Sequence, residues 1–247
     1  TLLSLDIVLF YFFWEVMLLP VFLMIGSYGF GDKVFATIKV TVYTMAGSLL
    51  MFVAILYLGV AHFNQFGEWS FSYDNLMQIT IIPYDVKVWL FLAFLAAFAI
   101  KIPIFPLHTW IMETYKNAPT GAVFLLSSIM AKLGVYAIVR FMIPIFPDIY
   151  VEFSTWFVAV GLFGLIYFGI AALMQDDIKR MFAYSSASHL SFISAGIFSL
   201  NSYGINGALY LIIAHAIATG ALFLLVGLIH EQTGFKTIKD LGGIAKK

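Results

Sequence analysis

The sequence predicts an all-α membrane protein, a polytopic bundle of about seven transmembrane helices. Of its 247 residues, 62% are hydrophobic and 11% are charged, whereas soluble domains have about 45–50% apolar and about 25% charged residues. A water-soluble core of this chain length cannot bury that excess. A bilayer core of about 30 Å needs roughly 20 apolar residues as a helix, and the stretches that qualify are about 4–27, 34–61, 86–110, 119–141, 152–174, 181–200 and 205–229.

These stretches are expected to be helices, because lipid offers the backbone no hydrogen-bond partners and the alternating pattern of barrel strands is absent. Basic residues then indicate the orientation, since cytoplasmic loops carry an excess of Lys and Arg. The side with Lys179 and Arg180 is expected to be cytoplasmic, because the opposite side has just Lys87 and Arg140. The basic residues on the first side are Lys33, Lys39, Lys116, Lys179, Arg180, Lys236, Lys239, Lys246 and Lys247.

Composition excludes several kinds of site. The formal net charge is zero, so the chain has no basic field for nucleic acid. It has no cysteine, which excludes disulfides, zinc-thiolate sites and ordinary iron–sulfur ligation within this chain. No glycine-rich phosphate loop or dinucleotide fingerprint occurs either. We therefore expect no cofactor and no metal here. The chain starts at Thr1 without a basic leader, so further helices are expected before Thr1.

Three charged residues lie in the middle of predicted spans: Glu15, Lys101 and Lys132. An ionised group at the bilayer centre costs about 2.5–3.5 kcal/mol on insertion scales. Three such groups in one chain therefore indicate a functional role. Ionisable groups held away from water can exchange protons near neutral pH. The pattern therefore favours proton donors and acceptors. The alternative is a buried Glu–Lys pair that only locks helices together.

A helix break is predicted immediately after Lys101. The segment AIKIPIFPLHTW contains Pro103 and Pro106, and each proline removes a backbone donor and clashes with the preceding turn. A cation beside the free carbonyls of a helix C-terminal end is electrostatically favoured, and transporters build ion sites in this way. The alternative is a simple proline kink with a lysine nearby.

Histidines occupy two further spans. His189 lies in the serine-rich YSSASHLSFISAG and His215 lies in LIIAHAIATG. Imidazole can take and give a proton near pH 7, although a membrane histidine can equally make a structural bond between helices. Both interpretations stay open. His108, at the foot of the broken helix, is a candidate for admitting protons from the surface or for anchoring the helix at the interface.

Other features have simpler interpretations. The aromatic run Phe10 to Trp14 is expected to pack against lipid and other helices, and the acids Asp176 and Asp177 are expected in a solvated turn. Three tryptophans are expected in interfacial belts: Trp69, Trp89 and Trp110.

Five segments, spread over essentially the whole chain, resemble a known family. In order, FYFFWEVMLLPVFLMIGSYG, AFAIKIPIFPLHTW, NAPTGAVFLLSSIMAKLGVYAIVRF, QDDIKRMFAYSSASHLSFI and LIIAHAIATGALFLLVG resemble the antiporter-like subunit M (chain 4) family of respiratory complex I, NADH:quinone oxidoreductase. Sister families are multisubunit sodium/proton antiporters and membrane-bound hydrogenases. After PLHTW the family usually continues with an LPDAH-like segment. This chain has IMETYKNAPT at that place, so no contact of the family's LPDAH-like segment is assigned to these residues.

The resemblance implies a role for each buried ionisable group. Glu15 would be the key glutamate, Lys101 the lysine of the broken helix and Lys132 the connecting lysine. His215 would lead onward to a second half-channel, and His189 matches a histidine common there. In an inverted-repeat fold of this kind, residues 1–247 form a single transmembrane domain. Residues 1–141 would complete the first repeat, and residues 152–247 would open the second and include a cytoplasmic tail.

The resemblance also implies the partners. The chain would be a proton-translocating subunit in a bacterial inner (plasma) membrane, beside other membrane-arm subunits of complex I. NADH, FMN, iron–sulfur clusters and quinone would lie in partner subunits, with no redox catalysis in this chain. The alternatives are a subunit of a sodium/proton antiporter or membrane-bound hydrogenase, and a membrane scaffold with locking ion pairs.

Overall fold

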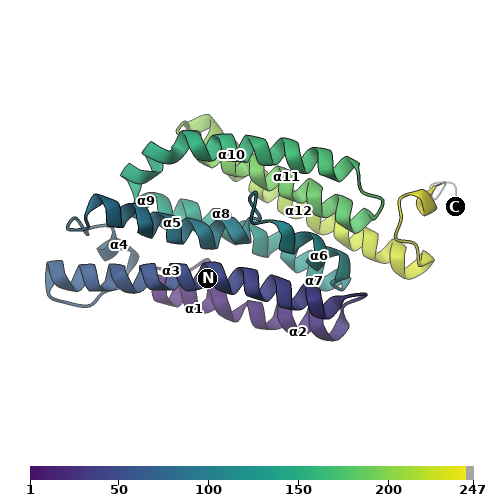
Figure 1. The fold of residues 1–247 in the computed structure, drawn as a ribbon, viewed down its shortest axis with the longest axis horizontal. Helices are drawn as coiled ribbons and strands as arrows, with labels where there is room; N and C mark the ends of the chain where they lie inside the picture. The colour runs from purple at the N-terminus through teal and green to yellow at the C-terminus, as the bar shows by residue number, and fades with distance from the viewer. Residues whose placement is uncertain (243–247) are drawn as a thin grey trace.

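The computed structural model describes residues 1–242 as helices that run side by side along one direction (Figure 1). The all-α prediction is thereby confirmed. In chain order the elements are α1 (Ile7–Val16), α2 (Leu18–Tyr28), α3 (Lys33–Phe66), α4 (Tyr73–Leu76), α5 (Tyr84–Lys101), α6 (Thr109–Asn117), α7 (Thr120–Leu125), the π-helix η1 (Leu126–Met130), α8 (Ala131–Ala137), the π-helix η2 (Ile138–Met142), α9 (Ile143–Ile145), α10 (Pro147–Leu173), α11 (Ile178–Ile197), α12 (Ser202–Thr233) and the 3-10 helix η3 (Lys239–Leu241).

Five helical segments of the described chain are long and apolar enough to cross a membrane: Ile7–Tyr28, Lys33–Phe66, Thr120–Ile145, Pro147–Leu173 and Ser202–Thr233. The two remaining predicted spans are also helical, but they carry more polar and charged residues. The predicted span 86–110 is α5 followed by a break and by α6, and α5 has charged residues at both ends. The predicted span 181–200 corresponds to α11, which is a full helix of 20 residues but is rich in serine.

A first interruption lies next to Glu15. Helix α1 ends at Val16 and α2 begins at Leu18, with Met17 between them. Pro20 explains the interruption, because it has no N–H to donate to the carbonyl of Val16 one turn earlier. Glu15 therefore lies at the end of a helical segment rather than in the middle of a regular helix.

The span that carries Lys132 contains two π-helical turns. Helix η1 precedes the lysine and η2 follows it, so α8 is a short α-helical piece between two wider turns. Single π turns inside α-helices occur often at functional sites. Small residues let neighbours approach this span closely. A Cβ on Gly134 would lie 2.9 Å from the carbonyl oxygen of Phe98, and a Cβ on Gly220 would lie 2.9 Å from the Phe124 ring.

Helices α10 and α11 pack tightly through small side chains. A Cβ on Gly161 would lie 2.9 Å from the Cβ of Ala195, and a Cβ on Gly164 would lie 2.6 Å from the hydroxyl of Ser191. Close approach through small residues is the usual way for helices to associate in lipid. It explains why the serine-rich α11 is held in the bundle although it is less apolar than its neighbours.

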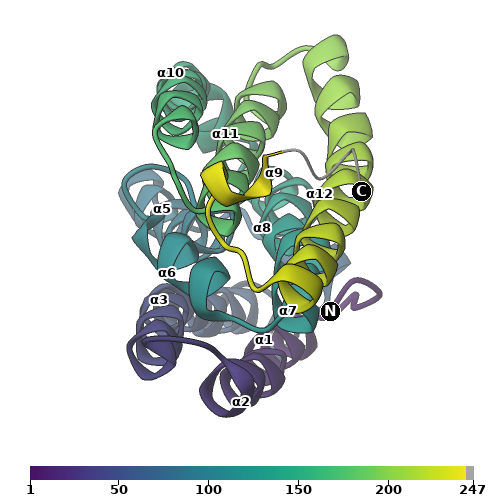
Figure 2. The ribbon, with the colours of Figure 1, turned by 90° about the vertical axis from the view of Figure 1, so that its right-hand side faces the viewer.

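The two ends of the bundle differ in charge. Described basic residues gather at the end that faces the viewer in Figure 2, where α2, α6 and α12 end and α11 begins. At the other end Lys87 pairs with Asp148 at 3.9 Å, and Arg140 lies over the ring of Tyr73. The predicted grouping of basic residues is therefore present in the described chain. Two residues of that group lie outside the described residues: Lys246 and Lys247.

Candidate functional site

Lys101 is the last residue of α5 and lies at the predicted break. Its side chain is 2% exposed, and its Nζ has no hydrogen-bond partner among the described residues. The expectation that it lies against free carbonyls was wrong. The indole Nε1 of Trp110 donates to the carbonyl of Ile100 at 2.8 Å, and the N–H of Ile104 donates to that of Ala99 at 2.9 Å.

An aromatic face replaces those carbonyls as the neighbour of the ammonium. The Nζ of Lys101 lies 4.8 Å from the ring centroid of Trp14, a distance at which the ring quadrupole attracts a cation. Trp14 is held by edge-on and tilted contacts with Phe98 and Phe10. It thus packs in the core, as predicted for the aromatic run, and also forms part of the lysine's environment.

Trp110 was predicted to lie in an interfacial belt, and this was wrong. The residue is 2% exposed and bonds to the broken end of α5. Its indole satisfies a carbonyl that the prolines leave free, which explains its burial. Trp69 and Trp89 are exposed, as expected of belt residues.

Glu15 is near Lys101 without touching it. The carboxylate attracts the ammonium electrostatically, yet no Lys–Glu contact within 4.0 Å joins them. One carboxylate oxygen, Oε1, is buried without a hydrogen-bond partner in the described chain. The side chain also lines a groove of about 400 Å³ between α2 and α3, together with Thr41 and Met45. The pair is therefore open in this structure.

A small cavity separates Lys101 from the helix that carries Lys132. It has a volume of about 10 Å³ and is lined by Lys101, Thr44 and Trp110 on one side and by Met130 and Ala131 on the other. This is about the space that one water needs. Its walls are mostly apolar, so the described side chains do not form a continuous polar chain between the two lysines.

Lys132 belongs to a second polar group, formed with α12. Its side chain is 6% exposed, and its Nζ donates to the carbonyl of Ser127 in η1. The same Nζ lies 3.5 Å from the hydroxyl of Thr219, which in turn donates to the carbonyl of His215 at 2.6 Å. The π turn thus presents a carbonyl to the lysine, and Thr219 joins the lysine to α12.

His215 and His189 are neighbours at the α11–α12 boundary. Their ring centroids are 5.3 Å apart. His215 is 4% exposed, and both of its ring nitrogens lack a hydrogen-bond partner in the described chain. His189 is exposed. Of the serines beside it, Ser188 and Ser194 donate to backbone carbonyls of Leu165 and Leu190. The buried hydroxyls of Ser186 and Ser191 have no hydrogen-bond partner in the described chain.

His108 stands apart from both groups. It is buried against the aromatic rings of Phe105, Tyr167 and Phe168. Its Nδ1 has no hydrogen-bond partner in the described part of the chain. The side chain is 6% exposed, and a role in admitting protons stays a prediction.

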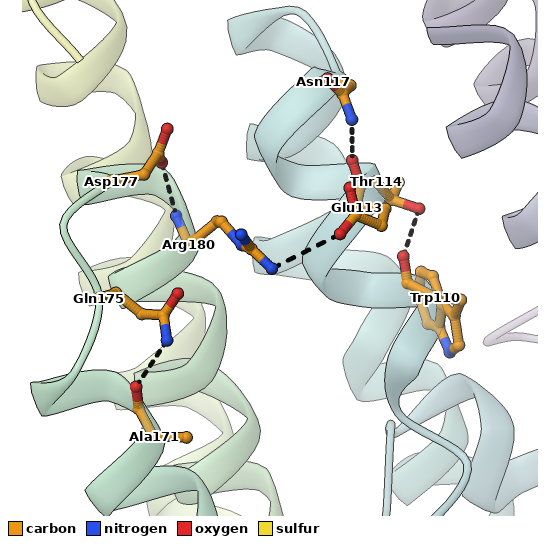
Figure 3. A network of polar contacts seen from close by, with 8 residues as sticks. All are labelled: Trp110, Glu113, Thr114, Asn117, Ala171, Gln175, Asp177 and Arg180. Carbon is orange, nitrogen blue, oxygen red and sulfur yellow. Dashed lines mark hydrogen bonds and ion pairs between the residues drawn. The ribbon is translucent and has the colours of Figure 1, made fainter. Parts of the chain in front are cut away.

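A polar network at the basic end joins α6 to α11 (Figure 3). Arg180 pairs with Glu113 at 3.5 Å, and the side chain of Asp177 accepts from the N–H of Arg180 at 3.0 Å. The predicted solvated turn was therefore wrong in part, because Arg180 pairs across helices and Lys179 is buried. Glu113 lies in the segment IMETYKNAPT, where this chain departs from the family's usual sequence, and no motif in the sequence pointed to the ion pair.

The predicted residues thus form two groups rather than one line. The first joins Glu15, Trp14 and Lys101 at the helix break, and the second joins Lys132, Thr219, His215 and His189. No cluster of three or more His, Asp or Glu side chains in residues 1–242 could hold a metal ion.

Residues 4–247 match a family model, which is described as "NADH:quinone oxidoreductase/Mrp antiporter, TM". The chain belongs to this family. It is 36% identical over 246 residues to the NADH-quinone oxidoreductase subunit M of Rickettsia prowazekii, with 99% of this chain and 49% of that protein covered. It is 35% identical over 250 residues to the subunit M of Escherichia coli, with 99% of this chain and 49% of that protein covered.

A solved structure of respiratory complex I from Thermus thermophilus contains a similar chain. The TM-score is 0.87 and the identity is 33%, with 95% of this chain and 49% of that chain covered. The chain thus spans about half the length of the curated relatives it matches. The fold is that of an antiporter-like membrane subunit.

Proposed function

We propose that this chain is the proton-conducting part of a membrane subunit of NADH:quinone oxidoreductase. Two facts support the proposal together. The chain belongs to the NADH:quinone oxidoreductase/Mrp antiporter family, and its relatives include subunits M of that enzyme. The observation that carries the mechanism is the burial of Lys101 and Lys132, without a carboxylate within 4.0 Å, inside an apolar bundle.

The proposed proton path uses both groups of residues. When Glu15 and Lys101 approach each other, the carboxylate holds the ammonium in its charged form. When Glu15 turns toward the groove between α2 and α3, Lys101 can release its proton toward the cavity and Lys132. Thr219 and His215 would carry the proton onward, because the hydroxyl lies 3.5 Å from the lysine Nζ and His215 lies one turn earlier on α12, with both ring nitrogens free of hydrogen bonds in the described chain. A water in the cavity would bridge the apolar gap.

The energy must come from other polypeptides. The chain has no cysteine and no nucleotide loop, so NADH, FMN, iron–sulfur clusters and quinone would be held by partner subunits. We propose that neighbouring membrane-arm subunits pass on a conformational or electrostatic change to Glu15. The chain would lie in a bacterial inner membrane with the Lys179 and Arg180 end in the cytoplasm. Residues 1–141 and 152–247 would belong to two successive repeats.

Substitution of the buried charges tests the proposal. Lys101→Ala and Glu15→Ala should each leave the complex assembled and greatly reduce the protons moved per NADH oxidised in proteoliposomes. Lys87→Ala is the matched control, because Lys87 belongs to the same helix but lies at its end beside Asp148. Normal pumping by assembled Lys101→Ala would contradict the proposal. Loss of assembly in both variants would favour a structural lock instead.

A cation/proton antiporter is the second candidate, because the family description includes Mrp antiporters. The same buried groups would then exchange sodium for protons. Sodium uptake in proteoliposomes, driven by a proton gradient without NADH, would favour this candidate. Proton movement that needs NADH oxidation and is indifferent to sodium would favour the first.

A further inference from the structure

A second feature of the structure lies at the basic end of the bundle, away from the buried relay. A hollow opens there between the α2–α3 turn, the start of α11 and the end of α12; Figure 2 shows these backbone segments at the end of the bundle that faces the viewer. Its volume is about 20 Å³, and its walls include Phe30, Lys116, Lys179 and Lys236. The proton path described above uses none of these residues.

Positive charge exceeds negative charge in this hollow. In the described chain, Lys116, Lys179 and Lys236 have no ion-pair partner within 4.0 Å. Lys179 is 8% exposed and donates to the carbonyl of Ala118 at 3.2 Å. One acid, Asp177, lines the hollow, where its carboxylate accepts the N–H of Arg180 and attracts the ammonium of Lys179. Three ammonium groups therefore share one carboxylate.

Phe30 brings two of these ammonium groups together. The Nζ of Lys179 lies 5.4 Å from the centroid of its ring and the Nζ of Lys236 lies 5.8 Å from it. The edge of His230 packs against the same ring at 6.0 Å. Like charges held close together repel each other, so the arrangement is stabilised by any anion that enters between them.

The hollow also lies at the ends of two apolar spans, where a bilayer around them would place its headgroups. The spans Ile7–Tyr28 and Ser202–Thr233 both end beside it, and its walls combine lysines with apolar Phe30 and Val226. Basic pockets between transmembrane helices on the cytoplasmic side are the sites that hold anionic lipid headgroups. Lysine binds phosphate as a point charge, without a fixed fork geometry.

We propose that this hollow binds a phosphate anion, supplied by the headgroup of an anionic phospholipid at the surface of the membrane. Lys116, Lys179 and Lys236 contact the phosphate oxygens, and Phe30 and Val226 lie beside the glycerol and the first methylenes. The bound lipid would hold the end of α12 and the segment after it against the start of α11. This site is independent of proton transfer, so it can stand or fall without the proposed function.

Lipid binding to the full-length protein tests the site. The protein, purified in detergent with its accompanying subunits and stripped of lipid, is titrated with phosphatidylglycerol, phosphatidylcholine or inorganic phosphate and followed by native mass spectrometry. Phosphatidylglycerol should bind and phosphatidylcholine should not. Lys236→Gln should weaken phosphatidylglycerol binding about fivefold, and Lys116→Gln with Lys236→Gln about 25-fold, because each basic residue near an anionic surface contributes about that factor.

The control variant is Lys239→Gln. Lys239 is exposed, follows Lys236 in the same segment and pairs with Asp176 at 3.4 Å outside the hollow. Its substitution should leave binding unchanged. Because Lys116 and Lys236 are also exposed, their substitution should not unfold the bundle. Tighter binding of inorganic phosphate than of phosphatidylglycerol, lost in the same variants, would support the anion site and assign it to free phosphate. Equal phosphatidylglycerol binding by wild type and the double variant would overturn the proposal.

Discussion

Substitution of Gly134 by alanine offers a sharp test of how the helix break is positioned. Gly134 lies on α8, directly against the end of α5. A Cβ placed there would lie 2.6 Å from Cγ1 of Ile102 and 2.9 Å from the carbonyl oxygen of Phe98. Ile102 can rotate away, but the backbone oxygen of Phe98 cannot move without moving the last turn of α5, which carries Lys101.

The expected magnitude follows from two opposing effects. Overpacking of a tight contact costs about 1–3 kcal/mol, whereas replacing glycine by alanine inside a helix gains up to about 1 kcal/mol. Gly134→Ala should therefore lower the free energy of unfolding by about 1–2 kcal/mol. It should also reduce proton pumping, because the ammonium of Lys101 would shift relative to Trp14 and the cavity.

Gly121→Ala is the matched control for this test. Gly121 lies in the same span, and a Cβ there would meet no atom within 4 Å. Thermal unfolding of the purified protein should place Gly134→Ala below wild type and Gly121→Ala at or above it, and pumping should fall in the first variant alone. Equal stability and equal pumping of the two variants would refute the close packing of α8 on α5.

Two further substitutions probe the two polar groups separately. Trp14→Leu removes the aromatic face beside Lys101, which is worth about 2 kcal/mol to a desolvated cation; pumping should fall strongly, and Trp14→Phe should restore part of it. Unchanged pumping in Trp14→Leu would argue against that contact. Thr219→Val keeps the shape of the side chain but removes the hydroxyl beside Lys132. Pumping should fall several-fold in the assembled complex, while Thr233→Val on the same helix should pump normally, and equal effects would contradict a role for Thr219.

Sequence reasoning predicted the helical segments well because hydrophobic length and proline act locally. The break after Lys101 follows directly from the two prolines that come next in the chain. Helices α5 and α11 are less uniformly apolar than the other spans, because packing holds them in the bundle although they carry polar and charged residues. Packing of one helix on another through small residues such as Gly161 depends on the sequence of the neighbouring helix. The sequence of one segment alone therefore does not reveal it.

The contacts of the site were harder to predict because they join distant segments. Lys101 in α5 meets Trp14, which lies four helices earlier in α1, and no spacing rule links the two. Trp110 looked like a belt residue by its place at a span end, yet its indole bonds to Ile100 across the break. The π turn before Lys132 also has no recognised sequence pattern. By contrast, Thr219 could be predicted to face the same way as His215, since residues four apart share a helix face.

The central claim is that buried charges at mid-bundle carry protons. Its most direct measurement is the number of protons moved per NADH oxidised by proteoliposomes that contain the assembled enzyme with Lys101→Ala, beside wild type and Lys87→Ala. The account predicts a large loss of proton movement for Lys101→Ala and wild-type values for Lys87→Ala. Wild-type proton movement by the assembled Lys101→Ala enzyme would contradict it.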